Sequence, residues 1–441
     1  MRIGRRLLIL IFPVILIAAA PRGLKAQDAE QDSVARAKVD SLEAKIRALE
    51  ARLDSLLAAL ARGEGADSAA KSAGAELEAL RAAARKAGGE QEQDTTEASR
   101  TRNLSILNPE ISVTGNVLGQ YLSPAGEQSY FTFVPREFEF AFVAALDPYT
   151  RTRIFLSYEQ EFAIAGLVEE EEQGGEGGHS GFGLEEGYVY WVGLPAQLGL
   201  KVGHFRQQIG LYNRWHNHAL VEVDRPLPTV AFLGDDGLIQ TGLNLVAPPL
   251  RTGPGLQSLT LEVTNTSNEA LFDDSKTNLS ALGNFTSFWD LSAASYLELG
   301  AAAVYGENRE ESLKTSLFNV FAIFRWRPPG QALYHDLRLS GEYYWARKNY
   351  GDPDLEGNGG YLQGNYRFSR RWVAGFRYDF LDDYGGDPNI QMVVPSITWW
   401  QSEWMFVRMQ YHYVKPSGLD ASHTVIAQIV WAVGPHKHET Y

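Results

Sequence analysis

Two histidines in one polar segment are the side chains of this 441-residue sequence that come closest to a metal-binding pattern. His216 and His218 lie in the stretch RWHNHAL, so on an extended chain both imidazoles face the same side. His204 upstream and the acidic run at 169–181, which includes His179, add nitrogen and oxygen ligands of the kinds that zinc accepts. Because these ligands come from separate segments, two interpretations stay open: a zinc site at His216 and His218, or loop histidines with ordinary hydrogen bonds.

The same segment carries charges of both signs. Residues 207–236 follow the apparent strand QLGLKVGHF, contain many Asn, Arg, His and Pro residues and do not alternate, which predicts a long loop. If this loop folds into the lumen of a barrel, its charges create a transverse field at a constriction, and that field favours small hydrophilic solutes. The alternative is an extracellular loop whose charges pair with one another. The candidate constriction residues are Arg206, Arg214, Glu222, Asp224, Arg225, Asp235 and Asp236.

The sequence offers little for catalysis. It has no cysteine, which excludes a thiolate nucleophile, a disulfide framework and a cysteine-type zinc site. It contains no G-x-S-x-G elbow, no H-E-x-x-H motif and no phosphate-binding glycine loop. A net charge of −14 disfavours nucleic acid as a partner. We therefore expect no enzymatic activity. The alternative is an enzyme, because some outer-membrane barrels are proteases or lipases.

Strands must position these residues, because hydrophobicity alternates with a period of two from about Asn108 to the C-terminus. In RWVAGFRYDF (371–380), aromatic residues share one face of the strand, and Arg377 and Asp379 share the other. The same alternation places Arg338 and Arg367 on polar faces, so we add these two and Arg377 to the candidate pore residues. The same polar faces carry Glu137, Glu139, Glu159, Glu262 and Glu342, so the sequence predicts no preference for anions or cations.

Two architectures produce about sixteen alternating runs separated by turn-forming clusters: a soluble β-sandwich and a membrane barrel. The runs match the 9 to 11 residues that a tilted transmembrane strand needs, and they exceed the roughly 5 to 6 residues typical of soluble sheets. Aromatic residues near strand ends, such as Tyr121, Trp345, Trp372 and Tyr413, fit the interfacial girdles of a barrel. We predict an all-β transmembrane antiparallel barrel of about sixteen strands over residues 108–441.

The N-terminal quarter of the chain has a different pattern. Basic residues precede the apolar run LLILIFPVILIAAA, which predicts a signal peptide over 1–26 rather than an uncleaved membrane anchor. A helical segment over 27–87 and a polar linker over 88–107 follow. Spacings of three and four indicate a coiled coil that associates with copies of itself, although a single amphipathic helix on the barrel or membrane gives the same apolar stripe. The stripe consists of Val39, Leu42, Ile46, Leu49, Leu53, Leu56 and Leu60.

Several stretches resemble a bacterial outer-membrane family labelled zinc-regulated outer-membrane receptor-like, which is similar in style to the phosphate-selective porin O/P group. The resemblance covers the first half of the predicted barrel best. It implies a bacterial outer-membrane barrel, a coiled-coil arm associated with trimers, and a His-containing tail that ends in a terminal aromatic residue, here GPHKHETY. The matching stretches are NPEISVTGN (108–116), REFEFAFVAALDPYTRTRIFLS (136–157), LEEGYVYW (184–191), LKVGHFRQQIGLYNRWHNHALVEVDRP (200–226) and FLGDDGL (232–238).

These observations predict an outer-membrane porin for passive diffusion of small hydrophilic solutes or ions, with the N-terminal segment in the periplasm. Residues 27–107 offer no plug domain, so passive diffusion is favoured over active uptake. Lipid is the expected partner of the barrel. The sequence predicts no cofactor, with zinc at the two histidines as the alternative. The alternatives are a zinc-uptake receptor and a structural tether that reaches through the periplasm by its coiled coil.

Overall fold

The computed structural model describes residues 109–167, 180–272, 275–308, 313–349, 355–382 and 389–434. The predicted signal peptide, coiled coil and linker lie outside these residues, as do His179 and the C-terminal tail from 435 to 441. Among the described residues, no helix is long and apolar enough to cross a lipid bilayer.

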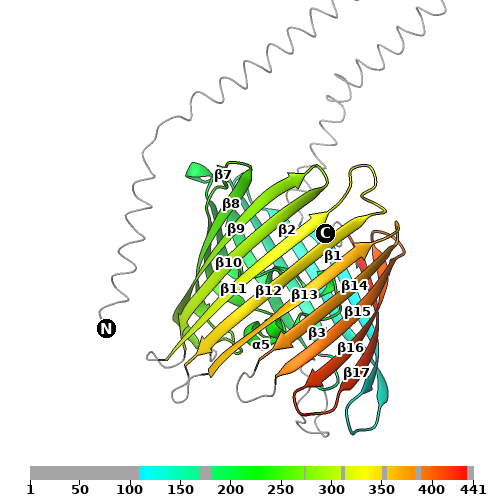
Figure 1. The fold of residues 1–441 in the computed structure, drawn as a ribbon. Coiled ribbons are helices and arrows are strands. Elements are labelled where there is room, and N and C mark those ends of the chain that lie inside the picture. Colours follow the sequence, from blue (N-terminus) through cyan, green and yellow to red (C-terminus); the bar gives the residue numbers. More distant parts are fainter. Residues whose placement is uncertain are drawn as a thin grey trace, which may run out of the picture. The chain divides into compact units, whose positions relative to one another are not determined.

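The strands form one antiparallel sheet that closes on itself, because the last strand pairs with the first, for example Gly119 with Ala427 (Figure 1). The strands are β1 (Glu110–Ser123), β2 (Tyr130–Ala145), β3 (Thr150–Gln160), β4 (Ser180–Trp191), β5 (Gly199–Arg206), β6 (Ile239–Val246), β7 (Leu250–Thr252), β8 (Gly255–Thr266), β9 (Ser275–Ser292), β10 (Ser295–Glu307), β11 (Lys314–Trp326), β12 (Asp336–Lys348), β13 (Leu355–Arg367), β14 (Trp372–Leu381), β15 (Ile390–Trp400), β16 (Met405–Pro416) and β17 (Ser422–Val433).

The short strand β7 continues β6 rather than adding a place to the ring. Both strands pair with β8, and Pro248 and Pro249 lie between them. Proline has no backbone N–H to donate, so this pair interrupts the ladder. Sixteen strand positions therefore close the ring, and the prediction of an antiparallel barrel of about sixteen strands is confirmed.

Side chains alternate between the lumen and the outer surface along each strand. On β14, Trp372 and Phe376 are 42% and 52% exposed, whereas Arg377 and Asp379 are fully buried. The predicted assignment of the two faces of this stretch is therefore correct. Large apolar side chains cover the outside of the ring, including Phe133, Leu243, Leu261, Phe285, Phe318, Leu362 and Met409. A contiguous apolar surface of this extent is typical of a barrel wall in contact with hydrocarbon.

The two ends of the barrel differ in their connections. At the end where β1 begins and β17 ends, called here the proximal mouth, most connections are short, and one of them contains the 3₁₀ turn η2 (Pro195–Gln197). At the opposite end, the distal mouth, most connections are longer. This asymmetry matches the short turns and long loops of outer-membrane barrels.

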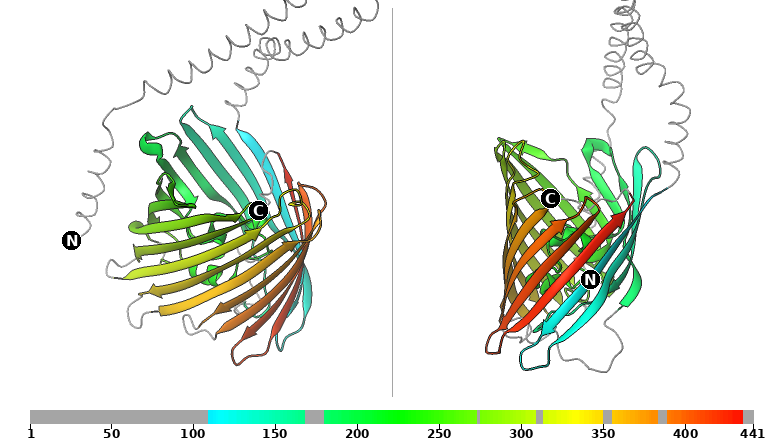
Figure 2. Two further views of the ribbon diagram at one scale, coloured as in Figure 1. Left: turned by 45° about the horizontal axis from the view of Figure 1, so that its top comes forward. Right: turned by 90° about the vertical axis from the view of Figure 1, so that its right-hand side faces the viewer.

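The longest described connection, 207–238, joins β5 to β6 and is called here the lumen loop. It contains the 3₁₀ turns η3 (Tyr212–Arg214) and η4 (Asn217–Ala219) and the helix α5 (Leu227–Leu233). Figure 1 and Figure 2 show this green segment inside the ring of strands. The helix α5 packs against β12, β13 and β14, and its Phe232 and Leu233 belong to the largest apolar cluster of the lumen. The prediction of a loop over 207–236 is confirmed, and it lies in the lumen.

The outward face of the strands should not tolerate a charge. Leu362, at the middle of β13, is 68% exposed, so arginine there should destabilise the folded barrel by about 2–4 kcal/mol in lipid vesicles. Denaturant titration of vesicle-inserted protein measures this cost. Leu419, 58% exposed in the turn after β16, is the matched control, and its replacement by arginine should change stability by less than about 1 kcal/mol. Equal costs at both sites would contradict a lipid-facing wall.

Candidate functional site

Hydrogen bonds within the lumen loop connect its parts to one another. Its two ends meet where the Gln207 N–H donates to the Leu238 carbonyl at 3.0 Å. The Asn213 amide group bridges the same two residues, donating to both carbonyls and accepting from the Leu238 N–H. The buried Arg225 guanidinium donates to three further loop carbonyls, those of Tyr212, Trp215 and Asp235. These bonds fix the shape of the loop independently of its contacts with the wall.

Glu342 on β12 holds the start of the loop. Its carboxylate accepts hydrogen bonds from the backbone N–H groups of Leu211 and Tyr212 and from the Tyr361 hydroxyl. Gly210 lies against this carboxylate with a φ of +60°. A Cβ at this position would collide with the Glu342 oxygen, so only glycine permits this approach.

Asp224 anchors the end of the loop to β14 and β16. Its carboxylate forms an ion pair with Arg377 at 2.5 Å and a contact with His412 Nε2 at 3.0 Å, and it also accepts a hydrogen bond from Gln410. Arg377 is shared with Asp379, at 2.9 Å. Burial raises the pKa of Asp224, but Arg377 and His412 outweigh burial and hold this pKa well below its ordinary value. Asp224 is therefore ionised when the loop is docked.

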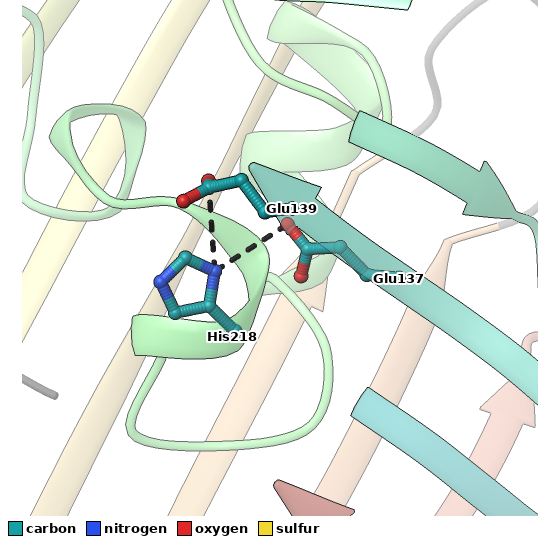
Figure 3. Close-up of side chains that lie close together, drawn as sticks. All are labelled: Glu137, Glu139 and His218. Carbon is teal, nitrogen blue, oxygen red and sulfur yellow. Dashed lines mark hydrogen bonds and ion pairs between the residues drawn. The ribbon is translucent and has the colours of Figure 1, made fainter. Parts of the chain in front are cut away.

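The two predicted metal-binding histidines meet carboxylates of the opposite wall. His216 Nδ1 lies 2.7 Å from Glu139 Oε2 and 3.1 Å from Glu185 Oε1. His218 Nδ1 lies 3.5 Å from Glu137 Oε1 and 3.7 Å from Glu139 Oε2. Figure 3 shows Glu137 and Glu139 reaching from β2 toward His218 on the loop. Burial lowers the pKa of His216, but the adjacent carboxylates outweigh burial and raise it well above its ordinary value.

Other predicted site residues occupy fixed places in the wall or loop. Arg206 pairs with Glu185 and donates to the Asp236 carbonyl, so it closes the base of the loop. Glu222 accepts from the Tyr212 hydroxyl at 2.5 Å and from the Gln363 amide. Arg214 lies 5.9 Å from the centre of the Phe321 ring. His204 does not join the histidine cluster, because its Nδ1 contacts the Thr241 hydroxyl at 3.0 Å.

A cavity of about 1000 Å³ opens between the lumen loop and the wall near the distal mouth. One part of its lining is apolar and includes Phe162, Ile164, Leu227, Ile390 and Met392. The other part is charged: Arg136, Glu159, Asp224, Arg225, Asp235 and Asp236. Partial desolvation inside the cavity and the neighbouring Asp236 raise the pKa of Asp235, whose side chain is exposed to the cavity. With Glu161, Glu185 and Glu269, seven carboxylates and two guanidinium groups line this cavity.

A second, smaller cavity of about 80 Å³ lies on the other side of the loop. His218 and the three residues that follow it line this cavity, whereas Asn217, Asp224 and Arg225 line the larger one. Its other walls include four arginines and one aspartate near the proximal mouth: Arg325, Arg338, Arg367, Arg408 and Asp336. The predicted residues Arg338 and Arg367 therefore lie together, apart from the predicted residues of the loop.

The loop crosses the whole lumen. Its histidines contact β2 and β4, and its first residues contact β12. In the ring order, β12 and β13 lie opposite β3 and β4. Any solute that passes through the barrel must therefore pass the loop.

Sequence reasoning missed part of this site. It placed Glu137 and Glu139 on the polar face of β2 but did not connect them to the histidines. Arg136, Glu159 and Glu185 were not among the candidates at all. The alternation on β2 identified the face of its glutamates, but no signal in the sequence indicated how deep the loop would lie.

No protein-family model matches this sequence. An uncharacterised protein of Aquifex aeolicus (strain VF5) is 28% identical over 234 residues, which are 45% of this chain and 48% of the relative. The match thus spans about half the length of that protein.

Solved structures with similar architecture are outer-membrane proteins. OprB of Pseudomonas putida matches with a TM-score of 0.49 and 12% identity, over 77% of this chain and 97% of that chain. The outer membrane channel DcaP of Acinetobacter baumannii matches with a TM-score of 0.47 and 7% identity, over 75% of this chain and 99% of that chain. OmpT, an outer membrane protein of Vibrio cholerae, matches with a TM-score of 0.47 and 8% identity, over 74% of this chain and 97% of that chain. The family resemblance of the sequence stays a prediction.

The close approach of Gly210 to the wall can be tested by adding one methyl group. Gly210→Ala should release the start of the lumen loop and speed backbone hydrogen exchange over 207–215 at least tenfold, because the new Cβ meets Glu342. Gly418→Ala is the matched control, since Gly418 has a φ of +79° but no atom within 4 Å of the added Cβ. Equal exchange in 207–215 for both variants would show that the loop does not rest on Glu342.

Docking of the loop should weaken in acid. The pKa of Asp224 is lower in the docked state than the value of about 3.9 in an undocked chain, so the undocked state binds more protons. The stabilisation is therefore complete above about pH 4 and is lost as pH falls below it. Hydrogen exchange over 221–230, corrected for the intrinsic effect of pH, measures this loss.

A substitution provides the control for this pH effect. Asp224→Asn should reproduce the fast exchange at pH 7, because Arg377 then loses one of its two carboxylates. Asp290→Asn, at an exposed carboxylate on β9, should leave loop exchange unchanged. Slow exchange over 221–230 in the Asp224→Asn protein at pH 7 would contradict the proposed anchor.

Proposed function

We propose that this protein is an outer-membrane porin that allows passive diffusion of small hydrophilic solutes or ions, with the lumen loop as its constriction. The observation that supports this most is the position of the loop: it crosses a closed barrel and presents acidic and basic side chains to a cavity of about 1000 Å³. The proposal assigns transport to the chain and no catalytic reaction.

The charges at the constriction select solutes by their polarity. A polar solute that enters the cavity exchanges its water shell for contacts with charged side chains such as Asp236 and Arg136, whereas an apolar solute gains nothing from them. Several of these charges are held in place, because Asp224 is paired with Arg377 and Arg225 donates to loop carbonyls. Fixed charges maintain the transverse field that the proposal requires.

The orientation follows from the connections. We place the proximal mouth in the periplasm and the distal mouth outside the cell, because barrels of this class have short periplasmic turns and longer extracellular loops. Solutes would then enter the larger cavity first and reach the arginine-lined side of the loop afterwards.

Electrical recording tests the proposal directly. The full-length protein, reconstituted in a planar lipid bilayer, should give stable open-channel steps that do not depend on an energy source. Vesicles that hold a small sugar should release it at a rate proportional to the amount of protein. A barrel that inserts fully but neither conducts nor releases the sugar would overturn the porin function.

The acidic excess in the larger cavity predicts a preference for cations. Seven carboxylates and two guanidinium groups line it, so replacing Asp235 and Asp236 by asparagine should move the reversal potential in a salt gradient toward anions. Glu356→Gln is the control, because Glu356 lies half-exposed on β13, 3.2 Å from Arg347, and does not line the cavity. An unchanged reversal potential in the double variant would remove these aspartates from the permeation path.

We also propose that the heptads of residues 39–60 assemble the protein as a homotrimer. The support is the regular spacing of Val39, Leu42, Ile46 and the leucines that follow them. Deleting residues 34–62 should convert trimers to monomers in detergent, as measured by light scattering. A trimer that survives the deletion would leave the coiled coil free for the alternative role of a tether to the cell wall.

A further inference from the structure

We propose that Glu137, Glu139, His216 and His218 form a binding site for a divalent transition metal, with Zn²⁺ as the fitting ion, at the seam between the lumen loop and the barrel wall. The inference does not depend on whether the barrel conducts. It concerns two glutamates that the sequence analysis did not assign to a metal, and it gives the two histidines a definite set of partners.

The geometry fits a tetrahedral ion. A metal about 2.0–2.1 Å from each of its ligands places neighbouring ligand atoms roughly 3.3 Å apart. Glu139 Oε2 lies 2.7 Å from His216 Nδ1 and 3.7 Å from His218 Nδ1. The remaining glutamate, Glu137, places its Oε1 3.5 Å from His218 Nδ1. These three distances bracket the expected one. The ligand atoms of Glu137, Glu139 and His218 lie within 4.8 Å of one another, and those of Glu139 and His216 form a second such group with Glu185, so Glu139 connects the two histidines and side-chain movements must bring all four ligands around one ion.

Unpaired atoms in the cluster point to a missing partner. The side chains of Glu137 and Glu139 are at most 1% exposed. Nevertheless, Glu137 Oε2 and Glu139 Oε1 have no hydrogen-bond partner. Within the described part of the chain, neither glutamate forms an ion pair with a lysine or arginine. Buried carboxylates without such partners are costly, and a bound cation removes that cost.

The neighbouring carboxylate already has a cation of its own. Glu185 lies 3.1 Å from His216 Nδ1 and pairs with the buried Arg206. Arg206 therefore compensates Glu185, while the charges of Glu137 and Glu139 remain for the ion. A bound metal displaces the proton of His216, so that two carboxylates and two neutral imidazoles neutralise one divalent cation.

The donor set indicates the class of metal. Imidazole nitrogen is a ligand for zinc and related transition metals, whereas Ca²⁺ and Mg²⁺ prefer shells of oxygen ligands. The two histidines are on the loop, adjacent to and within η4, and the two glutamates are on β2. A bound ion would therefore link the loop to the wall, and its binding energy would stabilise the docked loop.

Zinc titration of the full-length protein tests the site. After treatment with a chelator, the detergent-solubilised protein should bind Zn²⁺ in competition with a chromophoric chelator, with Mg²⁺ and Ca²⁺ unable to displace it. Glu139→Gln and His218→Gln should each weaken binding at least about tenfold. Bound zinc should also slow hydrogen exchange over 207–220 in the unsubstituted protein and not in these variants.

Two controls separate this site from other zinc ligands of the chain. His423→Gln removes a histidine of β17 whose Nδ1 contacts the Tyr411 hydroxyl, and Glu356→Gln removes a half-exposed carboxylate of β13 that pairs with Arg347; neither side chain contacts the lumen loop. Neither should change zinc affinity by more than about twofold. The site would be overturned by any of three results: equal weakening in the controls, zinc affinity unchanged by Glu139→Gln and His218→Gln, or no zinc binding at all.

Anomalous scattering gives an answer that does not depend on how well the variants fold. Crystals of the unsubstituted protein soaked in zinc should show an anomalous peak between Glu139 Oε2 and the two Nδ1 atoms. A peak elsewhere, or none, would overturn the proposal. Conductance recorded in chelator reports on the porin function separately, so failure of the metal site and failure of the channel give different results.

Discussion

A buried charge of the lumen loop must be compensated by the wall or by the loop itself, and this constraint organises the interior. The ion pair of Asp224 with Arg377 is the central case, because both side chains are buried and each would be costly alone. Arg377 also pairs with Asp379 of the same strand, so a contact within the wall helps to hold this cation in place. The position of Asp224 then determines where the following helix α5 enters the apolar cluster of the lumen.

The closed sheet makes such an interior possible. Pairing of β17 with β1 leaves no free strand edge, so the outer face can be apolar while the inner face carries glutamates and arginines. The loop fills much of that inner space and leaves one large and one small cavity, on its two sides. Its contacts with β2 and β4 on one side and β12 on the other determine the path that remains for a solute.

The alternation of residues predicted the barrel well but the site only in part. Trp372, Phe376, Arg377 and Asp379 fall on the predicted faces, because a strand in a barrel wall separates its two faces with a period of two. The same rule could not reveal that Arg377 binds Asp224, since these residues are 153 positions apart. Contacts of this kind depend on how the loop folds in three dimensions, and nothing in the loop sequence is periodic.

The contacts of the two histidines could not be predicted from the sequence either. His216 and His218 were recognised by type and spacing, and Glu137 and Glu139 by their face of β2. Their meeting requires the loop to return across the lumen to the wall, which follows from bonds such as those of Asn213 and Arg225 within the loop. Residue types and strand faces are local properties, whereas the cluster is a property of the docked loop.

Thiol labelling tests most directly whether the lumen loop lies docked inside the barrel. The chain contains no cysteine, so a single introduced thiol reports on one position. A cysteine in place of the fully buried Val223 should stay unreactive to a charged maleimide in the folded protein, while a cysteine in place of the exposed Asp235 should react within minutes. Equally fast labelling at both positions would show that the loop is not docked and would contradict the account.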